Sequence, residues 1–119
     1  MIPKVTFLLD DRAICDAMSD AAQHAVSIRI MAAWATTGEG LTCLTKCKAV
    51  NRRAIVGTCF AATEPAAIEE LMRLGFELRI VEVIPNGGTF HPKVYIFAMA
   101  DGSQVVLLGS ANLLISAQI

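Results

Sequence analysis

The sequence predicts an α/β domain with a mixed, largely parallel sheet that ends in a β-hairpin. Segments with helical spacing alternate with short apolar runs, an order that is typical of parallel strands joined by helices. The last two apolar runs are separated by a short turn, which adds an antiparallel pair. A chain of 119 residues provides one hydrophobic core, so we expect a single domain that spans residues 1–119.

The first part of the chain is predicted to contain two helices and one strand. Residues 11–24 carry apolar side chains at helical spacing behind a pair of aspartates. The run from Val26 to Trp34 is almost continuously apolar, as a central buried strand would be. The stretch from Thr36 to Glu39 matches a capping box with Thr36 as the cap, and it predicts a helix that ends near Val50.

The next part is predicted to hold two strands and one further helix. A short strand from Arg53 to Phe60 leads to a helix with Thr63 as its cap, a proline in its first turn and Gly75 at its end. A third strand follows from Phe76 to Ile84. The Pro-Asn-Gly-Gly sequence at 85–88 predicts a turn.

The last two predicted strands form a hairpin. Its strands run from Thr89 to Met99 and from Gln104 to Leu108. Asp101 and Gly102 lie between them and favour a tight turn. Because the second strand runs antiparallel to the first, the chain returns to where the first strand began.

Composition argues against several classes of protein. The formal net charge of −1 provides no global attraction for nucleic acid, and the one basic cluster, Lys46, Lys48, Arg52 and Arg53, falls where cations stabilise a helix end. Neither a membrane span nor a secretion signal is indicated by the apolar runs. The four cysteines lack the spacing of a disulfide scaffold, so we expect reduced thiols and a cytoplasmic protein.

No metal or other cofactor is expected from the sequence. Cys43 and Cys47 could share one helical face. A zinc site needs about four ligands, however, and neither a second pair of cysteines nor a suitable histidine accompanies them.

His91 and Lys93 are the first candidates for chemistry. In the predicted strand they share one face with Tyr95 and Phe97. A histidine beside a lysine is costly to bury unless an anion accompanies the pair. We interpret the two aromatic residues, and Trp34 at the end of the first strand, as packing residues.

Ser110 and Asn112 complete the candidate site. They follow Gly109, which the hairpin carries back toward His91 and Lys93. An imidazole can attack phosphorus, a cation can neutralise the non-bridging oxygens, and hydroxyl and amide groups can hold them. The set predicts phosphodiester chemistry, and no metal is required if a second imidazole protonates the leaving oxygen.

His91-x-Lys93 followed by Gly109-Ser110-x-Asn112 resembles the signature of the phospholipase D superfamily, in its nuclease-like and restriction-endonuclease-like branches. The resemblance implies an α/β/α sandwich and a metal-independent hydrolase that forms a phosphohistidine intermediate. Carried over by position, His91 would be the nucleophile or the general acid. Phosphate would be bound by Lys93, Ser110 and Asn112, of which Ser110 would support the oxyanion.

The implied reaction needs a histidine on each side of the phosphorus, and the chain has one His-x-Lys. His24 has no lysine two positions on, and we interpret it as a residue on the surface of the first helix. We therefore expect a second copy of the chain to supply the other half-site, in a homodimer that sets two His91 residues face to face. The apolar fraction of 55% is in keeping with a surface that another chain covers.

The chain departs from the family pattern in three places. Ala98 stands near the position of the signature's aspartate, and Asp101 is explained by the turn. Leu114 stands where the nuclease-like branch often has threonine. The sequence ends at Ile119, before an acidic residue that follows in some relatives, so we expect a half-domain that is truncated at its C-terminus.

Three functions remain open at this point. The first is a nuclease-type phosphodiesterase that acts on DNA or RNA at a site shared by two copies. The second is a non-catalytic module that binds phosphate or nucleic acid and dimerises, with a pocket whose chemistry has lapsed. The third is a phospholipid-processing phosphodiesterase, which the lack of a membrane-inserting amphipathic segment in the sequence disfavours.

Overall fold

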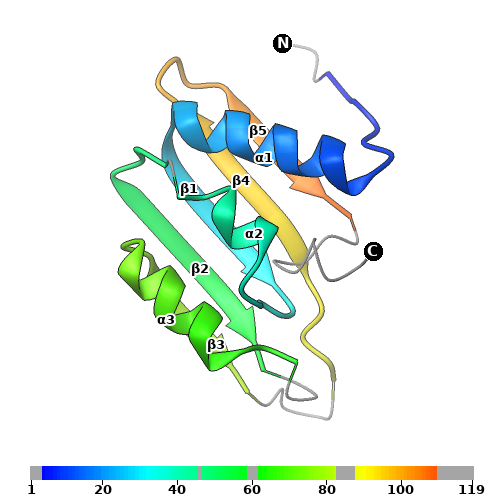
Figure 1. Ribbon diagram of the computed structural model, residues 1–119. Coiled ribbons are helices and arrows are strands. Elements are labelled where there is room, and N and C mark those ends of the chain that lie inside the picture. The colour runs from blue at the N-terminus through cyan, green and yellow to red at the C-terminus, as the bar shows by residue number, and fades with distance from the viewer. Residues whose placement is uncertain (1–3, 46, 59–61, 83–87, 110–119) are drawn as a thin grey trace.

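The computed structural model describes residues 4–45, 47–58, 62–82 and 88–109. In this part of the chain a five-stranded sheet has the order β3-β2-β1-β4-β5, with helices packed against it (Figure 1). The strands are β1 (Ala25–Ala32), β2 (Asn51–Gly57), β3 (Glu77–Val81), β4 (Lys93–Met99) and β5 (Gln104–Leu108). The helices are α1 (Asp11–His24), α2 (Glu39–Thr42) and α3 (Pro65–Arg73). The predicted α/β class is confirmed.

The sheet is mixed, as predicted, and β1 lies at its centre. The pairs β1–β2 and β2–β3 are parallel, whereas β1–β4 and β4–β5 are antiparallel. The direction of pairing therefore changes at β1, which has a parallel neighbour on one side and an antiparallel neighbour on the other.

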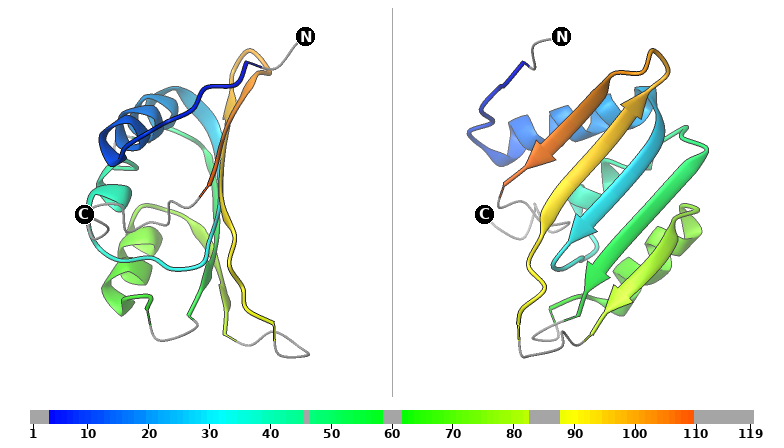
Figure 2. Two further views of the ribbon diagram at one scale, coloured as in Figure 1. Left: turned by 90° about the vertical axis from the view of Figure 1, so that its right-hand side faces the viewer. Right: turned by 180° about the vertical axis from the view of Figure 1, so that it is seen from behind.

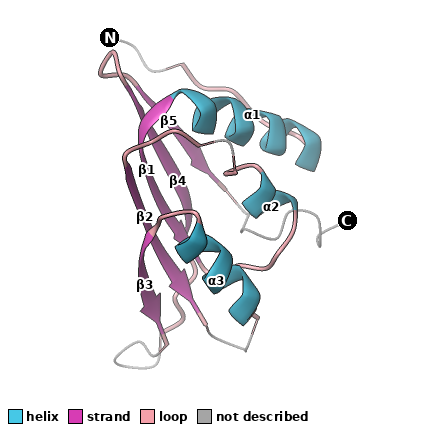
Figure 3. Ribbon diagram, turned by 60° about the vertical axis from the view of Figure 1, so that its left-hand side comes forward, coloured by secondary structure: helices cyan, strands magenta, loops and turns pink. Residues whose placement is uncertain are grey.

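The described helices cover one face of the sheet (Figures 2 and 3). The hydrophobic core lies between this face and the helices. Its largest fully buried side chains are those of Tyr95, Phe97, Met18, Ile28, Ile30, Leu44, Leu71 and Val56. The resemblance implied a sandwich with helices on both faces, and the described chain supplies the helical layer of one face.

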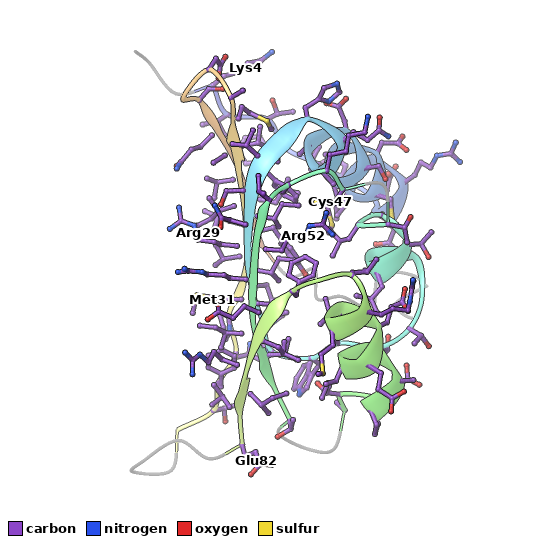
Figure 4. All side chains as sticks on the ribbon, turned by 90° about the vertical axis from the view of Figure 1, so that its left-hand side faces the viewer. Lys4, Arg29, Met31, Cys47, Arg52 and Glu82 are labelled. Atoms are coloured by element: carbon purple, nitrogen blue, oxygen red, sulfur yellow. The ribbon has the colours of Figure 1, made fainter. Side chains whose placement is uncertain are left out.

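The opposite face of the sheet carries arginine and aliphatic side chains. Arg29 and Met31 point away from the helices, whereas Arg52 points toward them (Figure 4). Arg29 lies directly opposite Arg53 in the register of β1 and β2. On the other side of Arg53, Glu77 of β3 lies in register with it, and its carboxylate is 3.7 Å from Nε of Arg53, so charged side chains cross this face.

The first helix has the bounds that its periodicity predicted. Asp10 is its N-cap, and Oδ1 of Asp10 accepts a hydrogen bond from the N–H of Ala13 at 2.8 Å. At the other end His24 is exposed, with Nδ1 2.8 Å from the carbonyl oxygen of Asp20. His24 is therefore a helix-surface residue, as expected.

The second helix is shorter than predicted. After α2 the chain continues in turns, in which the N–H groups of Leu44 and Cys47 bond to carbonyl oxygens three residues earlier at 3.0 and 3.1 Å. Apolar residues spaced by three suit this geometry as well as they suit an α-helix. The predicted cap is wrong, because the hydroxyl of Thr36 is buried and has no hydrogen-bond partner in the described chain.

Arg52 has a structural role. Its Nε donates to the carbonyl oxygen of Ala49 at 2.7 Å, and Nη2 donates to that of Cys47 at 3.1 Å. A third bond runs from Nη1 to the carbonyl oxygen of Leu74. These bonds join the segment before β2 to the end of α3, which supports the structural interpretation of this member of the basic cluster.

The third helix begins at Pro65 and is followed by Gly75, whose φ of 85° allows the chain to turn away. The predicted capping role of Thr63 is wrong. Glu64 occupies the N-cap position, and no side chain there forms a capping hydrogen bond. The hydroxyl of Thr63 instead contacts two other segments of backbone near the candidate site.

The hairpin of β4 and β5 forms as predicted, but β4 starts later than Thr89. Pro92 lacks the N–H group that a ladder residue needs, so the strand begins at Lys93. In the turn, Oδ1 of Asp101 accepts bonds from the N–H and the hydroxyl of Ser103 at 2.9 and 2.6 Å. These bonds lower the pKa of Asp101, which confirms its interpretation as a turn residue.

We predict that Tyr95 makes the fold sensitive to alkaline pH. The side chain is 2% exposed, and burial raises the pKa of its phenol well above the ordinary value. In the unfolded chain the pKa of a tyrosine is about 10. Above that pH the unfolded chain loses the phenol proton more readily than the folded chain does, which favours unfolding. The stability contributed by the neutral phenol is present below about pH 10 and is lost as the pH rises further. Tyrosinate absorbance should therefore appear together with loss of helical circular dichroism.

The chain has a single tyrosine, so the absorbance reports on this group alone. Tyr95→Phe keeps the ring and removes the titrating hydroxyl, and its free energy of unfolding should fall less steeply with pH. Equal slopes in the two proteins would show that Tyr95 is not the group responsible.

Candidate functional site

The candidate site lies at the carboxyl end of β1, where β4 begins. Lys93 is paired with Ala32, the last residue of β1. Because Val94 is paired with Leu108, Gly109 follows β5 beside the start of β4, as predicted. Open α/β sheets bind ligands outside the carboxyl ends of their strands, at the point where the strand order changes direction.

His91 and Lys93 contact each other. Nζ of Lys93 lies 2.9 Å from Nδ1 and 3.0 Å from Nε2 of His91, and 3.3 Å from its carbonyl oxygen. An ammonium group has only donors, so a hydrogen bond to the ring needs an imidazole nitrogen with a free lone pair. Partial burial lowers the pKa of Lys93. The pair therefore presents the amino group of a lysine beside an exposed imidazole.

Trp34 is in contact with both members of the pair. Its ring centroid lies 5.2 Å from that of His91, and the two rings meet edge to face at 76°. Nζ of Lys93 lies 5.8 Å from the centroid of the indole, within the range of a cation–π interaction. The interpretation of Trp34 as a packing residue did not include these contacts with His91 and Lys93. Its position just after the central strand could have indicated them, because residues there lie at the carboxyl edge of the sheet.

Hydrogen bonds fix the backbone segments that carry these side chains. The N–H of Ala33 donates to the carbonyl oxygen of Pro92 at 2.9 Å, which extends the pairing of β1 with the segment before β4. The N–H of Ala35 donates to Oγ1 of Thr63 at 3.1 Å. The same hydroxyl donates to the carbonyl oxygen of Gly57 at 2.5 Å. Thr63 thus joins the segments that follow β1 and end β2.

Gly57 makes room for the segment that carries His91. A Cβ atom at this position would lie 2.7 Å from the carbonyl oxygen of Ala33 and 2.9 Å from Cδ2 of Phe90. Both distances are shorter than a side chain tolerates without movement of its neighbours. A larger residue at position 57 would displace Phe90, which directly precedes His91.

Ser110 and Asn112, the other two predicted site residues, lie outside the described residues. The structure places Gly109 beside Lys93, and the assignment of Ser110 and Asn112 to phosphate binding stays a prediction. Tyr95 and Phe97, which share the predicted face of His91, are 2% and 0% exposed and pack in the core, as interpreted.

The described residues contain no group of three or more histidine, cysteine, aspartate or glutamate side chains that could hold a metal ion. Cys43 and Cys47 are buried as free thiols, and the thiol of Cys43 donates to the carbonyl oxygen of Cys15 at 3.6 Å. Within the same residues, none of the helices has the length and apolar character needed to cross a membrane.

The family described as "Cardiolipin synthase, PLD-like domain" matches residues 2–118. A crystal structure of polyphosphate kinase from Porphyromonas gingivalis matches with a TM-score of 0.58 and 17% sequence identity, over 87% of this chain and 19% of that chain. At this identity the likeness concerns the fold alone. A search of curated proteins gave no match.

We predict that the hydroxyl of Thr63 stabilises the backbone around the site. Thr63→Val should lower the free energy of unfolding by about 1–3 kcal/mol, because the N–H of Ala35 and the carbonyl group of Gly57 both lose a partner. Thr63→Ser retains the hydroxyl and should lose much less. Urea denaturation measures both effects, and a valine variant as stable as the original chain would contradict this role.

Proposed function

This chain belongs to the phospholipase D-like domain family, and we propose that it forms one half of a metal-independent, nuclease-type phosphodiesterase site. The family is associated in general with phosphodiester and phosphoryl-transfer chemistry. The observation that carries the proposal is the contact between Nζ of Lys93 and the exposed ring of His91 at the carboxyl end of β1. An imidazole and a lysine side chain that lie close enough to contact the same phosphate group suit nucleophilic attack on phosphorus.

The proposed reaction has two steps. A ring nitrogen of His91 attacks the phosphorus, a nitrogen–phosphorus bond forms, and the bond from phosphorus to the leaving oxygen breaks. A histidine on the far side donates its proton to that oxygen. Water then attacks the phosphohistidine, gives its proton to the second histidine and releases His91. Lys93 would neutralise the non-bridging oxygens, and we assign Ser110 and Asn112 to the same task.

The second histidine is proposed to come from another copy of the chain. His24 is the only other histidine in the sequence, and it ends α1 immediately before β1 begins. Since the site lies at the other end of this eight-residue strand, roughly 26 Å of extended chain separates the two positions. PLD-like domains often form dimers. A two-fold axis near the exposed ring of His91 would bring two such rings together.

Nucleic acid is the substrate class that we propose. The Phe-His-Pro-Lys and Gly-Ser-Ala-Asn sequences are of the kind found in the nuclease-like and restriction-endonuclease-like branches. We also keep the cytoplasm as the proposed compartment, on the pattern of the cysteines.

A non-catalytic phosphate-binding module is the second candidate. One observation favours it: Ala98 occupies the part of β4 near which the family signature has an aspartate. Such a module would bind phosphate through Lys93 and dimerise without turnover. Activity in the presence of a chelator separates the two candidates.

We predict that the chain hydrolyses bis-p-nitrophenyl phosphate and a fluorescent DNA oligonucleotide in the presence of EDTA. His91→Asn should reduce this turnover at least about a thousandfold, because the attacking nitrogen is removed. His24→Asn is the matched control and should leave the rate unchanged. Undiminished cleavage by His91→Asn would assign the chemistry to other residues.

Sedimentation of the same samples tests the shared site. The chain should be dimeric at the concentrations at which it turns over. Turnover by a strict monomer would contradict a site built from two copies, whereas a dimer that binds phosphate without turnover would favour the non-catalytic module.

We predict that Lys93 contributes mainly to the binding of phosphate. Lys93→Ala should weaken the affinity for inorganic phosphate about tenfold or more, because a charged hydrogen bond to the anion is lost. Lys48→Ala is the matched control, since this exposed lysine precedes β2 at the opposite end of the parallel strands. Calorimetric titration measures both affinities, and equal losses in the two variants would show that the charge acts only at long range.

A further inference from the structure

We infer that Trp34 is a positioning residue of this site, which holds His91 and Lys93 in the arrangement that meets a phosphate group. The inference rests on the proposed function and extends it to a residue outside both sequence motifs. Trp34 follows the central strand, far in sequence from the residues that it contacts.

The indole touches the two side chains in different ways. The centroid distance of 5.2 Å and the angle of 76° to His91 are those of an edge-to-face pair, which favours one relative orientation of the rings. Nζ of Lys93 lies 5.8 Å from the centroid of the indole, whose negative face attracts the ammonium group. One side chain thereby restrains both the direction of the imidazole and the position of the cation.

The indole is itself attached to a rigid part of the molecule. Ala33 and Ala35, on either side of Trp34, are 0% exposed. Their N–H groups are bonded to Pro92 and Thr63. This part of the backbone is therefore fixed in relation to both β2 and the start of β4.

His91 lacks such an anchor of its own. Its side chain is exposed, and it precedes β4 rather than lying within the ladder. An exposed imidazole outside a strand samples several rotamers unless a neighbour restrains it. Lys93 and Trp34 both contact the ring, and the edge-to-face contact with Trp34 is the one that restrains its direction. Removal of the indole should therefore affect orientation more than affinity.

Nuclear magnetic resonance of the two histidine rings tests the contact directly. Trp34→Leu should shift the ring resonances of His91, because the indole's ring current acts only on near neighbours, and leave those of His24 unchanged. Trp34→Phe should retain part of the original shift. Unchanged His91 resonances in the leucine variant would overturn the inference, whatever the activity.

Steady-state kinetics in EDTA test the role in positioning. Trp34→Leu should lower kcat roughly tenfold and change KM by less than about threefold, while Trp34→Phe recovers most of the rate. An unchanged kcat in the leucine variant, or a loss confined to KM, would overturn the positioning role. If the original chain has no turnover, the proposed function fails, and the resonance experiment alone decides the place of Trp34 beside His91.

Discussion

The antiparallel pairing of β4 with β1 is the constraint on which the rest of this structure depends. It sets Lys93 against the last residue of β1, and the bond between Ala33 and Pro92 continues the pairing to the neighbour of His91. The same register turns Tyr95 and Phe97 into the core. A slip of one residue would move all of these side chains to the opposite face. The core and the candidate site are therefore specified by one register.

The site is open, but the backbone beneath it is closely packed. The absence of a side chain at Gly57 lets Phe90 approach the end of β2, and the hydroxyl of Thr63 occupies the space between the segments that follow β1 and β2. Neither Gly57 nor Thr63 has a part in the proposed reaction. Both determine where the segments that carry His91 and Trp34 lie.

Periodicity predicted the elements that depend on local sequence. The α/β class, α1, the glycine at the end of α3 and the hairpin of β4 and β5 are all set by spacing or turn chemistry within a few residues. The capping roles of Thr36 and Thr63 could not be judged in this way, because they depend on tertiary packing. The hydroxyl of Thr63 accepts a bond from the N–H of Ala35, which is distant in sequence, and that of Thr36 is buried without a hydrogen-bond partner among the described residues. The same limit hid Trp34, whose contacts with His91 and Lys93 arise only when β1 and β4 pair.

The strand order also bears on how the chain folds during synthesis. The strands β1, β2 and β3 leave the ribosome before β4, so the central strand at first has an open edge on one side. Such an edge can pair with another nascent chain. The hairpin of β4 and β5 forms from local contacts and then closes that edge. The pairing of β1 with β4 joins the strands that are farthest apart in sequence among the paired strands of the described sheet, so it is expected to form late. Assembly of the candidate site and protection from aggregation would thus be acquired in the same late event.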